Sequence, residues 1–199
     1  MKLWQQWFAI IVISVFVLYL GNRQWTHRDI EVNWREEVLL GDGSRMWVER
    51  KKITGMRPGI NRGIKADQIV IPGEKGDVIW EFPLAPMILE RGTEVGRWVV
   101  IATPGYCEEH YEYGSPKPPY IQFDYINGQW SHKHVSPEWY GKRANLLGDF
   151  ERSYEQFSKR EGKSFTMKQI GQFSGRIFDA AKEQIVVEAN YKSNCYERE

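Results

Sequence analysis

Residues 120–135 read YIQFDYINGQWSHKHV, and this stretch decides the fold class. Two runs of alternating side chains, Tyr120 to Ile126 and Trp130 to Val135, flank the dipeptide Asn127-Gly128. An Asn-Gly pair between such runs is a strong signal for a β-hairpin, because both residues tolerate the positive φ of a two-residue turn. The sequence therefore predicts a hairpin in this region.

The turn also determines which side chains share a face of the hairpin. Successive side chains of a strand point to opposite faces. Ile121, Phe123 and Tyr125 therefore share one face, opposite the more polar Gln122 and Asp124. We expect the more apolar set to face the core.

A second hairpin is predicted over residues 30–53. Ile30, Val32 and Trp34 alternate with polar residues, as in a half-buried strand. The run ends at the turn-forming sequence Gly41-Asp42-Gly43-Ser44, and a second alternating run follows from residue 46.

Shorter strands are expected between the two hairpins. Residues 54–67, TGMRPGINRGIKAD, are rich in Gly and Arg and are predicted to form a loop. Four apolar runs follow and are predicted as strands: 68–71, 78–82, 87–89 and 97–102. Prolines between these runs remove backbone donors, so some of the strands should lie at sheet edges.

The C-terminal third has a helical pattern. Asp149 can cap a helix that ends near Glu161, and a second helix is predicted from Ser164 or Thr166 to Gln184. Residues 185–191 suit a final strand.

The N-terminus carries a long apolar run, Leu3 to Leu20, which reads LWQQWFAIIVISVFVLYL. Eighteen helical residues span about 27 Å, close to the ~30 Å hydrocarbon core of a bilayer. A cleaved signal peptide would need small residues near the end of the run, but Val17 to Leu20 are bulky. We therefore predict an uncleaved membrane anchor over residues 1–22 and a single globular domain over residues 23–199.

The predicted fold class is α+β. It comprises an N-terminal transmembrane helix, an antiparallel β-sheet or small sandwich over residues 30–135, and C-terminal helices over residues 149–184.

The side of the membrane on which the domain lies has two interpretations. Arg23, Arg28 and Arg35 follow the anchor, and the positive-inside rule then favours a cytoplasmic domain. A very short N-terminus with Lys2 is instead typical of a signal anchor with an exported domain. We expect a single-pass protein of the bacterial inner membrane with a periplasmic domain.

The charge balance argues against nucleic acid as a partner. Lys2 is the only charged residue among the first 22, so the rest of the chain holds 26 of the 27 Lys and Arg against 26 Asp and Glu. Nucleic-acid binding needs a basic excess that neutralises phosphates.

The chain has two cysteines, Cys107 and Cys195. They can form one disulfide, which would require an oxidising compartment. The alternative is two free thiols, because sequence gives no distance between them.

A proline-rich segment, YGSPKPPY, occupies residues 113–120. Three prolines favour an extended path, which can present a rigid surface to a partner. The candidate partner contacts are Tyr113, Pro116, Pro118, Pro119 and Tyr120. The alternative is a stiff connection that leads into the strand after Tyr120.

The same region carries a resemblance. The run YGSPKPPYIQF, then NGQW, then Asn145-Leu146-Leu147, resembles a group of uncharacterised bacterial membrane-anchored proteins. The likeness covers residues 30–150. It implies no activity, and the group often has Cys where this chain has Ser115, which bears on whether Cys107 and Cys195 pair.

Two combinations of residues suggest chemistry. His132 and His134 share a strand face and, with Glu108, Glu109 and His110, could begin a metal site, although three or four convergent ligands are needed.

Cys107 near His110 suggests a nucleophile with its base, although no orienting third group is evident. We therefore predict no catalytic, cofactor-binding or metal site.

The leading hypothesis is a membrane-anchored, non-catalytic binding or assembly protein of the bacterial envelope, with an envelope protein as its partner. The alternatives are an envelope enzyme of hydrolase type with an unfamiliar site, or a cytoplasm-facing accessory subunit of an inner-membrane complex.

Overall fold

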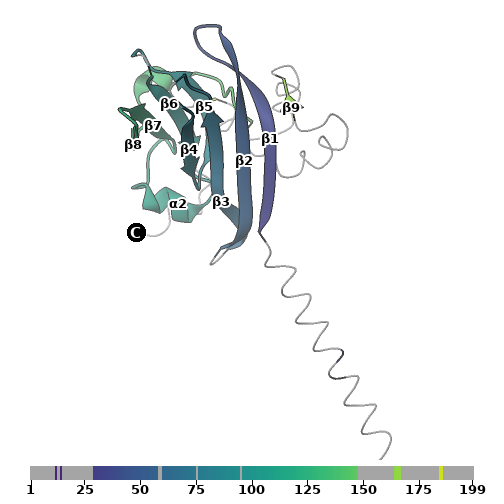
Figure 1. Ribbon diagram of the computed structural model, residues 1–199. Helices are drawn as coiled ribbons and strands as arrows, with labels where there is room; N and C mark the ends of the chain where they lie inside the picture. The colour runs from purple at the N-terminus through teal and green to yellow at the C-terminus, as the bar shows by residue number, and fades with distance from the viewer. Residues whose placement is uncertain are drawn as a thin grey trace, which may run out of the picture.

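The computed structural model describes residues 29–57, 60–74, 76–94, 96–147, 164–166 and 184–185, together with residues 12 and 14. Within these ranges the chain folds as a sandwich of two β-sheets (Figure 1). The β-rich part of the prediction is confirmed.

Within the described residues, the first sheet has five strands in the order β4-β3-β2-β1-β9. Its strands are β1 (Ile30–Leu39), β2 (Arg45–Arg57), β3 (Ile60–Ile71), β4 (Val78–Phe82) and β9 (Ser164–Phe165). The second sheet has four strands in the order β5-β6-β7-β8. Its strands are β5 (Ala85–Arg91), β6 (Trp98–Thr103), β7 (Ile121–Ile126) and β8 (Gln129–His134).

Both predicted hairpins are present. β1 and β2 pair antiparallel from Leu39↔Arg45 to Ile30↔Thr54. β7 and β8 pair across a two-residue turn from Ile126↔Gln129 to Ile121↔His134. Asn127 and Gly128 have φ of 53° and 85°, the positive values that such a turn requires.

The predicted loop over residues 54–67 is wrong. β2 continues to Arg57, and β3 begins at Ile60. The register of β2 with β3 shifts between Ile53 and Thr54 and again between Gly55 and Arg57. The ladder tolerates these glycine-rich residues because bulges absorb the irregularity and both strands gain backbone hydrogen bonds.

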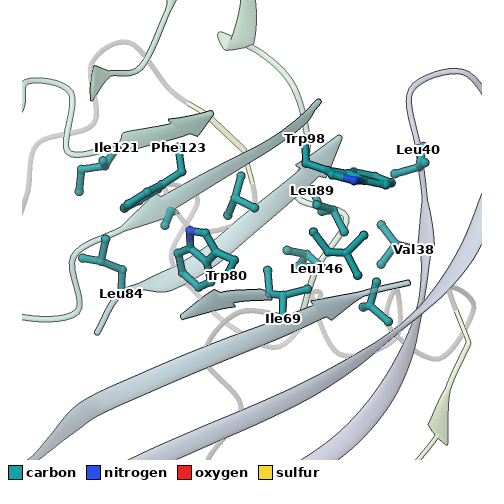
Figure 2. Close-up of a cluster of buried hydrophobic side chains, with 14 residues drawn as sticks. Val38, Leu40, Ile69, Trp80, Leu84, Leu89, Trp98, Ile121, Phe123 and Leu146 are labelled. Carbon is teal, nitrogen blue, oxygen red and sulfur yellow. The ribbon is translucent and has the colours of Figure 1, made fainter. Parts of the chain in front are cut away.

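The core lies between the two sheets (Figure 2). Trp80 of β4 meets Phe123 of β7 edge to face, with ring centroids 5.5 Å apart. Val38 and Ile69 come from the first sheet, and Val100 comes from the second. The predicted inward face of β7 is confirmed, because Phe123 is fully buried in this core.

A second apolar cluster covers the outer face of the four-stranded sheet. Ile88, Ile101 and Tyr120 pack there against Trp139, which lies in the 3-10 turn η1 (Pro137–Trp139), and against Ile185. The central strand β6 is therefore buried on both faces.

Polar side chains link the two sheets at two opposite sides of the sandwich, which we call its seams. Trp130 of β8 donates its indole N–H to the carbonyl oxygen of Ile79 in β4 at 2.7 Å. At the opposite seam, Asn145 donates to the carbonyl oxygens of Leu39 and Leu89 at 2.9 and 2.8 Å. Its Oδ1 also accepts the Leu89 N–H at 2.9 Å.

The predicted α+β class with C-terminal helices is wrong for the described residues, which are mostly β. The described segment 29–147 contains only the six-residue helix α2 (Cys107–Glu112) and η1. At the expected start of the second C-terminal helix, Ser164–Phe165 instead form β9, parallel to β1. Backbone pairing with β1 and full burial of Phe165 outweigh local helical preference there.

The rest of the predicted helical span, and most of the predicted strand 185–191, lie outside the described residues. None of the helices in the described part of the chain combines the length and apolar character that crossing a membrane requires. The predicted transmembrane helix is therefore not part of the described fold. Its segment, residues 1–22, lies outside the described residues except for Val12 and Ser14.

Candidate functional site beside the edge strand β8

Helix α2 and the turn after it shape one wall of the site. The Glu109 carboxylate accepts the Tyr106 N–H at 2.8 Å and so caps the start of the helix. At its end the chain reverses through Gly114 and Ser115, with φ of 78° and 52°. The Ser115 N–H donates to the His110 carbonyl oxygen at 2.8 Å.

This reversal contradicts the predicted extended path of residues 113–120. Two residues with positive φ turn the chain back on itself. The Tyr120 N–H donates to the Pro118 carbonyl oxygen at 2.8 Å, so the segment ends in a tight turn. Three prolines restrict their own φ, but Gly114 has no Cβ atom and adopts a positive φ at little cost, which lets the chain turn before them.

The folded-back segment and β8 enclose a pocket of about 210 Å³. Tyr113 and Pro116 line it from the proline-rich segment, and Ile121 lines it from β7. Three consecutive residues of β8 complete the lining: His132, Lys133 and His134. The pocket thus lies at the edge of the four-stranded sheet.

Ring contacts hold the pocket wall. The Tyr113 ring meets the His132 ring edge to face, with centroids 5.2 Å apart. The ring centroid of His132 in turn lies 5.9 Å from the ring centroid of the core residue Phe123. Burial, together with the nearby Glu112 carboxylate, raises the pKa of Tyr113, so its hydroxyl keeps its proton at neutral pH.

An ion-pair cluster supports β8 from the other face of the sheet. Asp124 accepts hydrogen bonds from Lys133 at 2.8 Å and from Arg97 at 3.1 Å. Burial alone would raise the pKa of Asp124, but the hydrogen bonds from Lys133, Gln122 and Arg97 hold it below its ordinary value. The negative charge of Asp124 therefore partly compensates the positive charge of Lys133.

The candidate partner contacts separate into two groups. Tyr113 and Pro116 line the pocket. Tyr120 is fully buried in the second apolar cluster, and Pro119 is buried as well, so neither side chain faces solvent. Pro118 is half-buried and lies outside the pocket lining.

Cys107 is disulfide-bonded and so presents no thiolate. The suggested pairing of Cys107 as nucleophile with His110 as base is therefore wrong. The only other cysteine of the sequence, Cys195, lies outside the described residues.

Within the described ranges, no group of three or more His, Cys, Asp or Glu side chains converges as metal ligands. His132 and His134 do share one face of β8, as the alternation predicts, and both line the pocket.

Sequence reasoning missed a buried charge network inside the sandwich. Arg50 of β2 bridges Glu36 at 2.6 Å and Asp67 at 2.7 Å, and all three side chains are fully buried. The Trp34 indole donates to Glu36 at 2.8 Å, and its ring stacks against the Arg50 guanidinium at 4.9 Å. Burial raises the pKa of Glu36 despite the attraction of Arg50.

A sequence signal for this network exists. Glu36 is two residues before Val38, and Arg50 is two residues after Val48, so each charge falls on the inward face of its strand.

Comparison of the chain with protein-family models, with curated proteins and with solved structures gives no match.

Proposed function

We propose that this chain is a membrane-tethered, non-catalytic binding or assembly protein of the bacterial envelope. Its β-sandwich holds a partner polypeptide at the pocket between the proline-rich segment and β8. The observation that carries the proposal is this pocket, which lies beside β8, the edge strand of its sheet in the described part of the chain.

The size of the pocket supports a macromolecular partner. Small-molecule and cofactor sites usually occupy about 300–1,000 Å³. A pocket of about 210 Å³ is smaller and suits one side chain of a larger partner. Its lining is partly apolar, from Tyr113, Pro116 and Ile121, and partly polar, from the β8 residues.

The chemistry of Cys107 supports an exported domain. Disulfides persist in oxidising compartments such as the periplasm and are rare in the cytosol. The disulfide at Cys107 therefore favours the periplasmic hypothesis over a cytoplasm-facing accessory subunit. The tether is supported by the run Leu3 to Leu20, which no charged residue interrupts.

Site-specific photo-crosslinking in cells tests the proposal. A photoreactive residue replaces Ser131, which is exposed on β8, or Glu49, which is exposed on the first sheet. We expect a discrete protein adduct in the membrane fraction from position 131 and none from position 49.

The double variant His132→Ala, His134→Ala serves as the matched pocket control. Both side chains are exposed, so the free energy of unfolding should change by less than about 1 kcal/mol. The adduct from position 131 should fall sharply in this background. Adducts of equal yield from both positions, or an adduct that ignores the double change, would refute a binding function for the pocket.

A further inference from the structure

We propose that the partner binds as an extended strand added to the outer edge of β8, the last strand of its sheet in the described residues, and places an acidic side chain in the pocket. This inference rests on the proposed function and specifies the partner's backbone form and its anchoring group. Two observations support it: β8 is an edge strand among the described residues, and hydrogen-bonding side chains line the pocket.

The first step concerns the backbone of β8. Ile126 and Gln129 are the partners that flank the two-residue turn, and the residues at that position of such a hairpin form a hydrogen-bonded pair. Such pairs alternate with non-hydrogen-bonded pairs along an antiparallel ladder. His132 and His134 therefore direct their own N–H and C=O groups away from β7.

The second step concerns what lies beyond that edge. β8 is the last strand of its sheet in the described residues. The neighbouring Trp130 donates its indole N–H to the Ile79 carbonyl oxygen, which ties the first part of β8 to β4. His132 and His134 are both exposed residues. An exposed row of backbone donors and acceptors is the template for strand addition.

The third step concerns the anchoring group. The imidazoles of His132 and His134 and the Tyr113 hydroxyl can all donate hydrogen bonds in the pocket. An ionised carboxylate only accepts them, and hydrogen bonds to charged groups are the stronger class. Lys133 is already paired with Asp124, so the histidines and Tyr113 supply most of the recognition.

The geometry of strand addition links the backbone edge of β8 to the anchoring group. The side chains of His132 and His134 share the pocket face, and alternate residues of an added strand project on that same face. One of them enters the pocket while its neighbours in sequence point to the opposite face. Affinity then comes from the backbone, and selectivity comes from the single anchored residue.

The test uses the full chain in detergent micelles and three synthetic peptides. The first is the capped pentapeptide Thr-Val-Glu-Val-Thr, and the second has Gln in place of Glu. The third is the Glu peptide with N-methyl groups on the alternate amides that would face β8. It keeps the carboxylate but cannot form backbone hydrogen bonds with β8 through those amides. Binding is followed by the amide resonances of β8 and by titration.

We expect the Glu peptide to shift the β8 resonances and to bind about tenfold more tightly than the Gln peptide, the ratio of one charge-assisted hydrogen bond. The N-methylated peptide with its β8-facing amides blocked should not bind. Equal binding of the Glu and Gln peptides, retained binding of that N-methylated peptide, or no shift with any peptide would overturn the proposal.

A matched pair of variants tests the same edge from the protein side. His134→Ala removes the imidazole and keeps the outward N–H, whereas His134→Pro removes both. An outward-facing proline is tolerated at a sheet edge, and the melting temperature checks this. We expect His134→Pro to bind the Glu peptide roughly threefold to tenfold more weakly than His134→Ala.

Equal affinities of these two variants for the Glu peptide would reject strand addition. If the proline variant unfolds, the N-methylated peptide decides instead, and its retained binding to the wild-type chain would reject strand addition. A crosslinked partner at position 131 that persists in His134→Pro would leave the binding function standing while rejecting the strand-addition mode.

Discussion

At the scale of single residues, Arg50 is a fully buried cation inside the sandwich. A guanidinium buried without solvent needs complementary charge, and Glu36 and Asp67 provide it within hydrogen-bonding distance. Such a network contributes little net stability compared with an apolar core, but removing one member leaves uncompensated charge. It joins side chains of three neighbouring strands, β1, β2 and β3.

Arg50→Ala is therefore expected to lower the free energy of unfolding by about 3–5 kcal/mol, because Glu36 and Asp67 are left buried without their cation. Chemical denaturation of the full chain measures the change. The matched control is Lys51→Ala, next in the same strand, whose ion pair with Glu31 is solvent-exposed and contributes about 1 kcal/mol or less. Equal losses in the two variants would contradict the assigned role of the network.

At the scale of elements, the β7–β8 turn determines which residues form the pocket wall. Because the side-chain period of a strand is two, a slip of one residue in register would move His132 and His134 to the opposite face. The two-residue turn at Asn127-Gly128 prevents that slip. The local turn is thus a condition for the candidate site.

Gly128→Ala should lower the free energy of unfolding by about 1–2 kcal/mol, because φ of 85° at this position is costly for any residue with a Cβ atom. Asn127→Gly keeps the required conformation and should change stability by less than about 1 kcal/mol. Thermal unfolding followed by circular dichroism compares the two variants. An alanine variant as stable as the wild type would show that the turn does not control register.

At the scale of the whole molecule, the two seams join separate sheets into one unit. Trp130 ties β8 to β4, and Asn145 ties β5 to the end of β1. β5 and β8 are the opposite edges of the four-stranded sheet in the described fold. Each seam also occupies backbone groups that an edge strand would otherwise expose.

Trp130→Phe, which removes the indole donor and part of the ring that packs against the core, should cost at least about 1 kcal/mol of unfolding free energy, and Asn145→Ala should cost about 2–4 kcal/mol. Because the two residues lie at opposite seams, the double variant should lose the sum within about 0.5 kcal/mol. The exposed Asn33→Ala is the control for loss of an amide. A double variant that loses much more or much less than the sum would show that the seams are coupled.

The sequence by itself determined the local features of this protein. The Asn127-Gly128 turn, the hairpin from Ile30 and the inward face of Phe123 follow from turn chemistry and a period of two. The same alternation predicts that His132 and His134 share a face.

The tertiary structure decided what depends on partners distant in the chain. Ser164–Phe165 form a strand because β1 offers them backbone partners, and residues 54–57 extend β2 because β3 pairs with them. The pocket exists because Gly114 and Ser115 fold Tyr113 back against His132, some 20 residues away along the chain. Non-local backbone pairing and burial outweigh local propensities, which differ by no more than about 1 kcal/mol per residue except at proline.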